Sequence, residues 1–320
     1  KPCAAPIATS FEQKFPELRA FRSAAYLFVM QSRHARHSGR AADCVEPLHT
    51  ALRFAQAVGV RADVMHRLRS LAMEAITLGE LRHAINSGTL SPEQLQGEIK
   101  FLEELEATEP PLEQVVEAEF QGTRAGALQY DRQLKAGGRR LPLLLGYNPK
   151  ALIRRLEQDR HDALSFIELP YSSVPPPLPQ RAKGGFRIPS VTAVIGDTTS
   201  GTFIFGCRSV IRSHMRTSSG RRGTQLLAAV ELHRSRHGGL PGTLQELQSM
   251  KLQGVEAMSI TDPLSEKPFI YRLNGDDYWL YSVGDNLTDD GGRPRRPGQS
   301  NVEDDVVFHR PATAEGDPNT

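Results

Sequence analysis

The chain has 320 residues, enough for two domains of ordinary size. Hydrophobic residues make up 39% and charged residues 24%, a balance that excludes both a disordered chain and a protein embedded in the membrane. The formal net charge of +2 is too small to make nucleic acid a default partner.

The first two fifths of the chain predict a bundle of short antiparallel helices. Leu48, Leu52 and Ala55 follow one another at helical spacing, and comparable apolar series continue to about residue 135. We therefore expect an α-helical domain with a leucine and alanine core over residues 1–168.

Local signals place the starts of two of these helices. Ser91-Pro92-Glu93-Gln94 is a capping box with proline at the first helical position. Asn148 before Pro149 caps a later helix. At each cap a side-chain oxygen accepts a backbone N–H that the first helical turn leaves unpaired.

Residues 169–202 change in composition and predict a linker. Four of the five positions from Pro175 to Pro179 are proline, which favours an extended polyproline conformation, and Gly184-Gly185 adds a flexible joint. Two interpretations stay open. The segment is either a stiff linker that crosses the surface of the bundle or a ligand for a proline-recognition domain.

A C-terminal module over residues 203–310 begins with a long helix. This helix is expected from about Phe203 to His237, where the apolar periodicity ends. Gly220 and Gly223 weaken its middle, so the sequence allows a break there.

Three short strands follow the long helix. Residues 269–273 and 278–283 are rich in aromatic and β-branched residues, and Asn274-Gly275 between them signals a hairpin. Val306-Val307-Phe308 predicts a third strand, and residues 311–320 predict a disordered tail. The expected fold class is α+β: an N-terminal α-helical domain, then a long helix packed on a small three-stranded antiparallel sheet.

An acidic loop lies between the second and third predicted strands. Carboxylates brought so close together repel one another unless a cation neutralises them. Calcium suits such a loop, because it accepts several oxygen ligands in irregular geometry. A solvated, mobile acidic loop is the alternative. The candidate carboxylate ligands are Asp285, Asp289, Asp290, Asp304 and Asp305.

The module resembles the C-terminal part of the major pseudopilin of bacterial type II secretion systems. The residues that carry the resemblance are the helix from Gln225 to His233, then Gly238-Gly239-Leu240-Pro241-Gly242-Thr243, Asp262-Pro263-Leu264 and Tyr281-Ser282-Val283-Gly284. In that family the loop after the Tyr-Ser-x-Gly strand binds calcium through aspartates, a serine and backbone carbonyls. The resemblance therefore adds Ser282 and the carbonyl oxygen of Leu287 to the candidate ligands.

The whole chain is similar to large bacterial envelope proteins that carry this module behind a helical region. That resemblance implies a location in the periplasm or cell envelope, a membrane anchor in an N-terminal segment, and partners among envelope or secretion-system proteins. It implies no known activity.

The sequence carries no motif for catalysis. Ser218-Ser219-Gly220 lacks the G-x-S-x-G frame of a nucleophile elbow, and the chain contains no glycine-rich phosphate loop. We therefore expect a non-catalytic structural or adaptor protein. The alternative is a ligand-binding receptor or a hydrolase with a site between the helical domain and the C-terminal module.

Two groups of residues keep open interpretations. A series of arginines on the long helix binds phosphate or anionic lipid, forms a solvated helix face, or pairs with glutamates of the bundle. Cys3 and Cys44 either form a disulfide or stay separate thiols, and Cys207 is left over. The arginine series consists of Arg208, Arg212, Arg216, Arg221 and Arg222.

Overall fold

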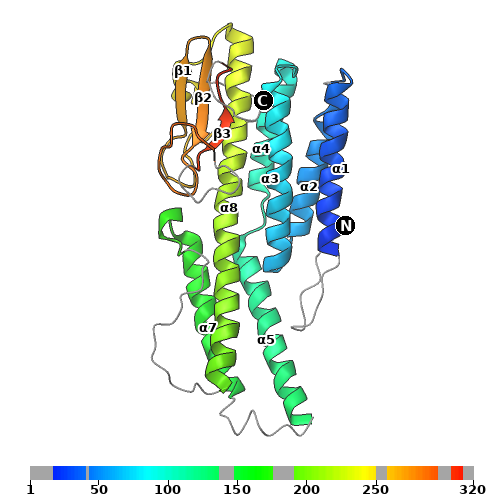
Figure 1. The fold of residues 1–320 in the computed structure, drawn as a ribbon, viewed down its shortest axis with the longest axis vertical. Helices are drawn as coiled ribbons and strands as arrows, with labels where there is room; N and C mark the ends of the chain where they lie inside the picture. The colour runs from blue at the N-terminus through cyan, green and yellow to red at the C-terminus, as the bar shows by residue number, and fades with distance from the viewer. Residues whose placement is uncertain are drawn as a thin grey trace.

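The computed structural model describes residues 17–40, 43–136, 148–175, 191–249, 258–294 and 304–312. Over these ranges the chain forms eight α-helices and one three-stranded antiparallel sheet, arranged as an elongated body (Figure 1). The α+β class that the sequence predicts, with a small antiparallel sheet beside a long helix, is confirmed.

Within the described ranges, six helices precede the long one. They are α1 (Glu17–His37), α2 (Glu46–Gly59), α3 (Val64–Asn86), α4 (Pro92–Ala107), α5 (Leu112–Ala136) and α7 (Pro149–Ser165). The predicted capping box starts α4. The Ser91 hydroxyl accepts the Gln94 N–H at 3.2 Å, and the Gln94 side chain accepts the Ser91 N–H at 3.0 Å. Asn148 caps α7 as expected.

The central element is α8 (Val191–His237), whose 47 residues extend roughly 70 Å. The sequence places its start near Phe203, but the helix begins twelve residues earlier, so the end of the expected linker is helical. The helix also continues through Gly220 and Gly223 without the break that the sequence allows. No helix in the described part of the chain, α8 included, is long and apolar enough to cross a membrane.

The sheet consists of β1 (Ile270–Asn274), β2 (Asp277–Ser282) and β3 (Val306–His309), paired antiparallel in that order. The expected hairpin joins β1 to β2, and its Gly275 has the positive φ, 63°, that such a turn needs. A short helix, α9 (Leu244–Gln248), lies between α8 and the sheet in the chain. Figure 1 shows the sheet and the pair α3 and α4 on opposite sides of α8.

One hydrophobic cluster runs through the helical bundle and the C-terminal module. Its members come from the segment that holds α1 to α4, from α8 itself, and from α9 and the sheet. Because they share one core, neither part can bury its apolar surface fully without the other. Helix α8 therefore belongs to both parts. Members that are at most 2% exposed include Leu48, Leu81, Leu226, Leu280 and Phe308.

Some expectations fall outside the described residues. These are the proline run from residue 176 onward, Cys3 with its suggested disulfide, and the tail from residue 313. Just before the proline run, the chain forms two short 3-10 helices, η2 (Phe166–Glu168) and η3 (Tyr171–Ser173). Cys44 and Cys207 are buried thiols, and burial raises the pKa of both.

Candidate functional site

The first carboxylate of the acidic loop docks the loop on the helical part of the molecule. Asp285 forms an ion pair with Arg216 of α8 and accepts a hydrogen bond of 2.5 Å from the hydroxyl of Tyr171 in η3. Arg212 in turn donates to the Tyr171 hydroxyl at 2.8 Å, and its guanidinium lies 4.0 Å from the centre of the ring. Burial and the hydrogen bond to Asp285 raise the pKa of Tyr171 to about 12. Asp285 is thus the link between the loop, α8 and η3.

A second carboxylate of the loop, Asp289, also has an arginine partner. It accepts hydrogen bonds from Arg272 of β1 at 2.5 Å and from the Tyr281 hydroxyl at 2.8 Å. Partial burial opposes ionisation, but these bonds outweigh it and lower the pKa of Asp289. The positive charge that the sequence argument assigned to calcium is therefore supplied at two aspartates by guanidinium groups.

The other three carboxylates join the two ends of the β2–β3 connection. Asp290 accepts the Asp304 N–H at 2.9 Å, and Asp304 accepts the Asp285 N–H at 3.2 Å. Asp305, only 2% exposed, accepts the backbone N–H groups of Gly292 at 2.7 Å, Arg293 at 3.2 Å and Asp290 at 3.4 Å. Burial raises the pKa of Asp305 in spite of these donors. These side chains therefore stabilise the backbone of the loop by bracing it, that is, by accepting hydrogen bonds from its N–H groups.

Asp262 organises the base of the loop, a role that the sequence analysis missed. Its carboxylate accepts hydrogen bonds from Ser282 at the end of β2 (2.7 Å) and from Ser219 of α8 (2.6 Å). Ser282, a candidate calcium ligand, also accepts the Gly284 N–H at 3.1 Å. The sequence analysis names Asp262 only among the residues of the pseudopilin resemblance, because its hydrogen-bond partners lie 20 and 43 residues away. Leu287, the other non-carboxylate candidate, has a left-handed backbone with φ 57°.

The described residues do not fit a preformed calcium site. Calcium takes six to eight oxygen ligands at about 2.3–2.6 Å. In the described part of the chain, no three acidic, histidine or cysteine side chains are placed to hold a metal ion together. Calcium binding stays a prediction, and at Asp285 and Asp289 the cation would compete with their arginine partners.

Asp305 offers a direct test of the bracing role. We expect Asp305→Asn to lower the free energy of unfolding by about 1–2 kcal/mol, because the amide keeps one acceptor oxygen but loses the charge that strengthens three hydrogen bonds. Urea denaturation measures the change. The exposed Asp276, replaced in the same way, is the control and should change stability by less than about 0.5 kcal/mol. Equal effects at both positions would contradict the assignment.

Most arginines of the series on α8 form hydrogen bonds or ion pairs within the molecule. Besides the two arginines that contact the loop and η3, Arg221 reaches Glu74 at 2.6 Å and Glu109 at 2.8 Å. Arg222 reaches Glu106 at 2.7 Å. Among the interpretations of this series, these two arginines follow the one in which they pair with glutamates of the bundle.

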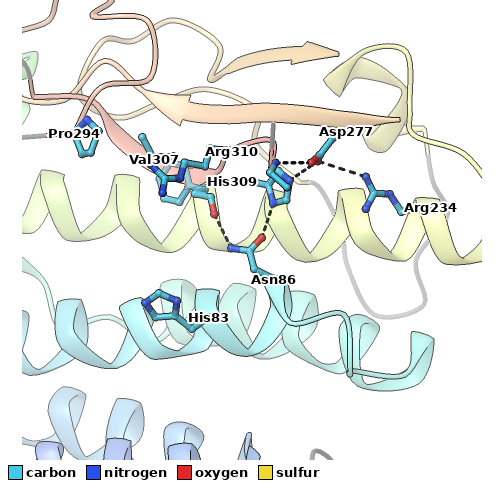
Figure 2. A pocket seen from close by; sticks show the side chains of 10 residues that line it. His83, Asn86, Arg234, Asp277, Pro294, Val307, His309 and Arg310 are labelled. Carbon is cyan, nitrogen blue, oxygen red and sulfur yellow. Dashed lines mark hydrogen bonds and ion pairs between the residues drawn. The ribbon is translucent and has the colours of Figure 1, made fainter. Parts of the chain in front are cut away.

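A cavity of about 690 Å³ lies at the seam between the bundle and the module, where the receptor or hydrolase alternative would place its site. Figure 2 shows that α3, α8 and the sheet contribute its polar side chains. Both ring nitrogens of His309 are engaged, one by Asp277 at 2.7 Å and one by Asn86 at 2.6 Å. None of the described lining residues is a serine, threonine or cysteine. The cavity therefore has room for a small molecule, and its described lining residues offer no hydroxyl or thiol nucleophile.

Comparison with known proteins assigns the chain to no family, because no family model, no curated protein and no solved structure matches it. The resemblance to pseudopilins rests on the quoted residues alone.

Proposed function

We propose that this is a non-catalytic structural or adaptor protein whose C-terminal module is held firmly against the helical bundle. The observation that carries the proposal is the link from Asp285 to Arg216 and Tyr171, which uses the acidic loop as a docking contact. The shared core around α8 supports it. Such a molecule presents a fixed surface to its partners.

The resemblance to envelope proteins supplies the location and the partners in this proposal. We place the protein outside the cytoplasm, in the periplasm or cell envelope, anchored to the membrane by an N-terminal segment. Its partners would be other envelope proteins, including those of a secretion or pilus-related assembly. Fractionation of native cells, with protease digestion of intact spheroplasts, tests this. Protection of the protein inside the spheroplasts would overturn the location.

Calcium is the second part of the proposal, and titration tests it. Calcium at ten times its dissociation constant should stabilise the folded protein by about 1.4 kcal/mol and raise Tm, whereas magnesium should not. Arg216→Met removes the competitor for Asp285, so it should raise the calcium affinity. An unchanged Tm, together with unchanged hydrogen exchange over residues 285–293, would remove calcium from the proposal.

A ligand-binding role is the second candidate, favoured by the seam cavity of about 690 Å³. Screening small polar molecules by NMR distinguishes the two functions. The structural role predicts no saturable shift of the Asn86 side-chain amide, which lines the cavity. Saturable binding at that position would favour the receptor.

A further inference from the structure

A short series of hydrogen bonds connects the bundle to the sheet across their interface, as Figure 2 shows. His309 ends β3 and is partly buried, with its ring stacked on Tyr278 at 4.0 Å between centroids. Its Nδ1 lies 2.6 Å from Oδ1 of Asn86, the last residue of α3. Its Nε2 lies 2.7 Å from Oδ1 of Asp277, the first residue of β2.

The orientation of the Asn86 amide follows from its second partner. Its Nδ2 donates to the backbone carbonyl of Phe308 at 2.9 Å. A carbonyl oxygen only accepts hydrogen bonds, so the reversed amide would bring two oxygens together. Oδ1 must therefore face His309, and as an acceptor it requires a proton on Nδ1.

The other side of the ring meets an ionised carboxylate. Asp277 accepts the backbone N–H of Tyr278 at 2.9 Å and that of Ala312 at 3.1 Å, and Arg234 of α8 lies 3.8 Å away. Burial opposes ionisation, but the bonds from His309 and from the two backbone donors outweigh it and lower the pKa of Asp277. A carboxylate accepts, so Nε2 must also carry a proton.

We propose that His309 is an imidazolium that connects the sheet to α3 through hydrogen bonds to Asp277 and Asn86. Loss of one of its protons breaks one of these two bonds and weakens the connection. A neutral ring has one N–H, so it can keep its bond to Asn86 or its bond to Asp277, but not both. An ordinary histidine changes charge near pH 6.5, so it is the side chain whose charge responds to pH between about 5 and 8.

Charged groups on every neighbouring element face this ring or its partners. Arg82 and His83 lie on α3, where Arg82 stands 5.3 Å from the centre of the Phe308 ring and His83 lines the cavity. Arg310 follows β3 and lines the same cavity. On α8, Glu231 accepts the Tyr278 hydroxyl at 2.7 Å, and Arg234 lies beside Asp277. The cations disfavour a positive charge on His309, whereas the Asp277 carboxylate favours it. Because Asp277 lies at hydrogen-bond distance from the ring, its attraction outweighs the repulsion from the more distant cations.

Because the two hydrogen bonds need both ring protons, both are present at low pH and one is lost where the ring gives up a proton. Between pH 5.5 and 8.5, the Tm of the wild-type protein should fall by about 2–4 °C more than that of His309→Gln. Amide exchange in β3, corrected for the intrinsic effect of pH, should rise over the same interval.

His83→Gln is the matched control, because His83 lines the same cavity and is exposed. It should keep the wild-type pH profile. A His309→Gln variant with the same profile as the wild type would overturn the proposal. NMR of the wild-type histidine rings tests the proposal without any variant. At pH 5.5 both ring nitrogens of His309 should carry protons, and scalar couplings across the hydrogen bonds to Asn86 and Asp277 should be visible. A neutral ring at that pH would also overturn it.

Discussion

Replacing Arg221 with leucine should lower the free energy of unfolding by about 3–5 kcal/mol. The Arg221 side chain is 1% exposed and binds Glu74 of α3 and Glu109 at the junction of α4 and α5. Burial opposes its charge, but these two carboxylates outweigh burial and raise the pKa of Arg221. Leucine would leave the buried Glu74, itself 1% exposed, without its arginine. An uncompensated buried carboxylate is strongly destabilising.

The neighbouring Arg222 provides the control for this prediction. Its side chain is 28% exposed and pairs with Glu106, which is 31% exposed. An ion pair so open to water contributes at most about 1 kcal/mol, so Arg222→Leu should have a small effect in the same urea denaturation experiment. Similar losses at both positions would contradict the buried network. The double variant Arg221→Leu with Glu74→Leu should lose less than the sum of the two single losses.

Gly223→Ala should destabilise the protein by about 3 kcal/mol, although alanine normally favours a helix by about 1 kcal/mol over glycine. A Cβ on Gly223 would lie 2.1 Å from Cζ of Phe308. That ring is 2% exposed and packs edge-on against Phe269 at 5.7 Å, so it has little room to move. Overpacking at this point pushes β3 away from α8.

Gly220, one turn earlier on the same helix, should respond in the opposite direction. A Cβ there meets only Leu78 Cδ1, at 3.9 Å, an ordinary contact. Gly220→Ala should therefore raise the free energy of unfolding by up to about 1 kcal/mol, through helix propensity. Thermal unfolding of the two variants measures both signs. Stabilisation at both positions would show that β3 does not rest on Gly223.

Local signals in the sequence determined the elements of this fold. The capping box at Ser91, the cap at Asn148 and the hairpin at Asn274-Gly275 each depend on residues within four positions of one another. Such signals act through the backbone nearby, so they need no knowledge of the rest of the chain. The α+β class followed from the order of these elements.

Local signals in the sequence did not predict that α8 is continuous. Glycine weakens a helix on average, so Gly220 and Gly223 allowed a break without requiring one. The structure has none, because Phe308 of β3 packs where Gly223 lacks a side chain, and the surrounding core holds the helix. Tertiary packing outweighed propensity there.

The sequence by itself determined that the acidic loop needs positive partners, since adjacent carboxylates repel one another wherever they lie. Only the tertiary structure decided which partners are used. Tyr171 and Arg216 lie 114 and 69 residues from Asp285, and Asn86 lies 223 residues from His309. Nothing in the neighbouring residues encodes such pairs, because folding brings them together by burying the core that α8 shares with the bundle and the sheet.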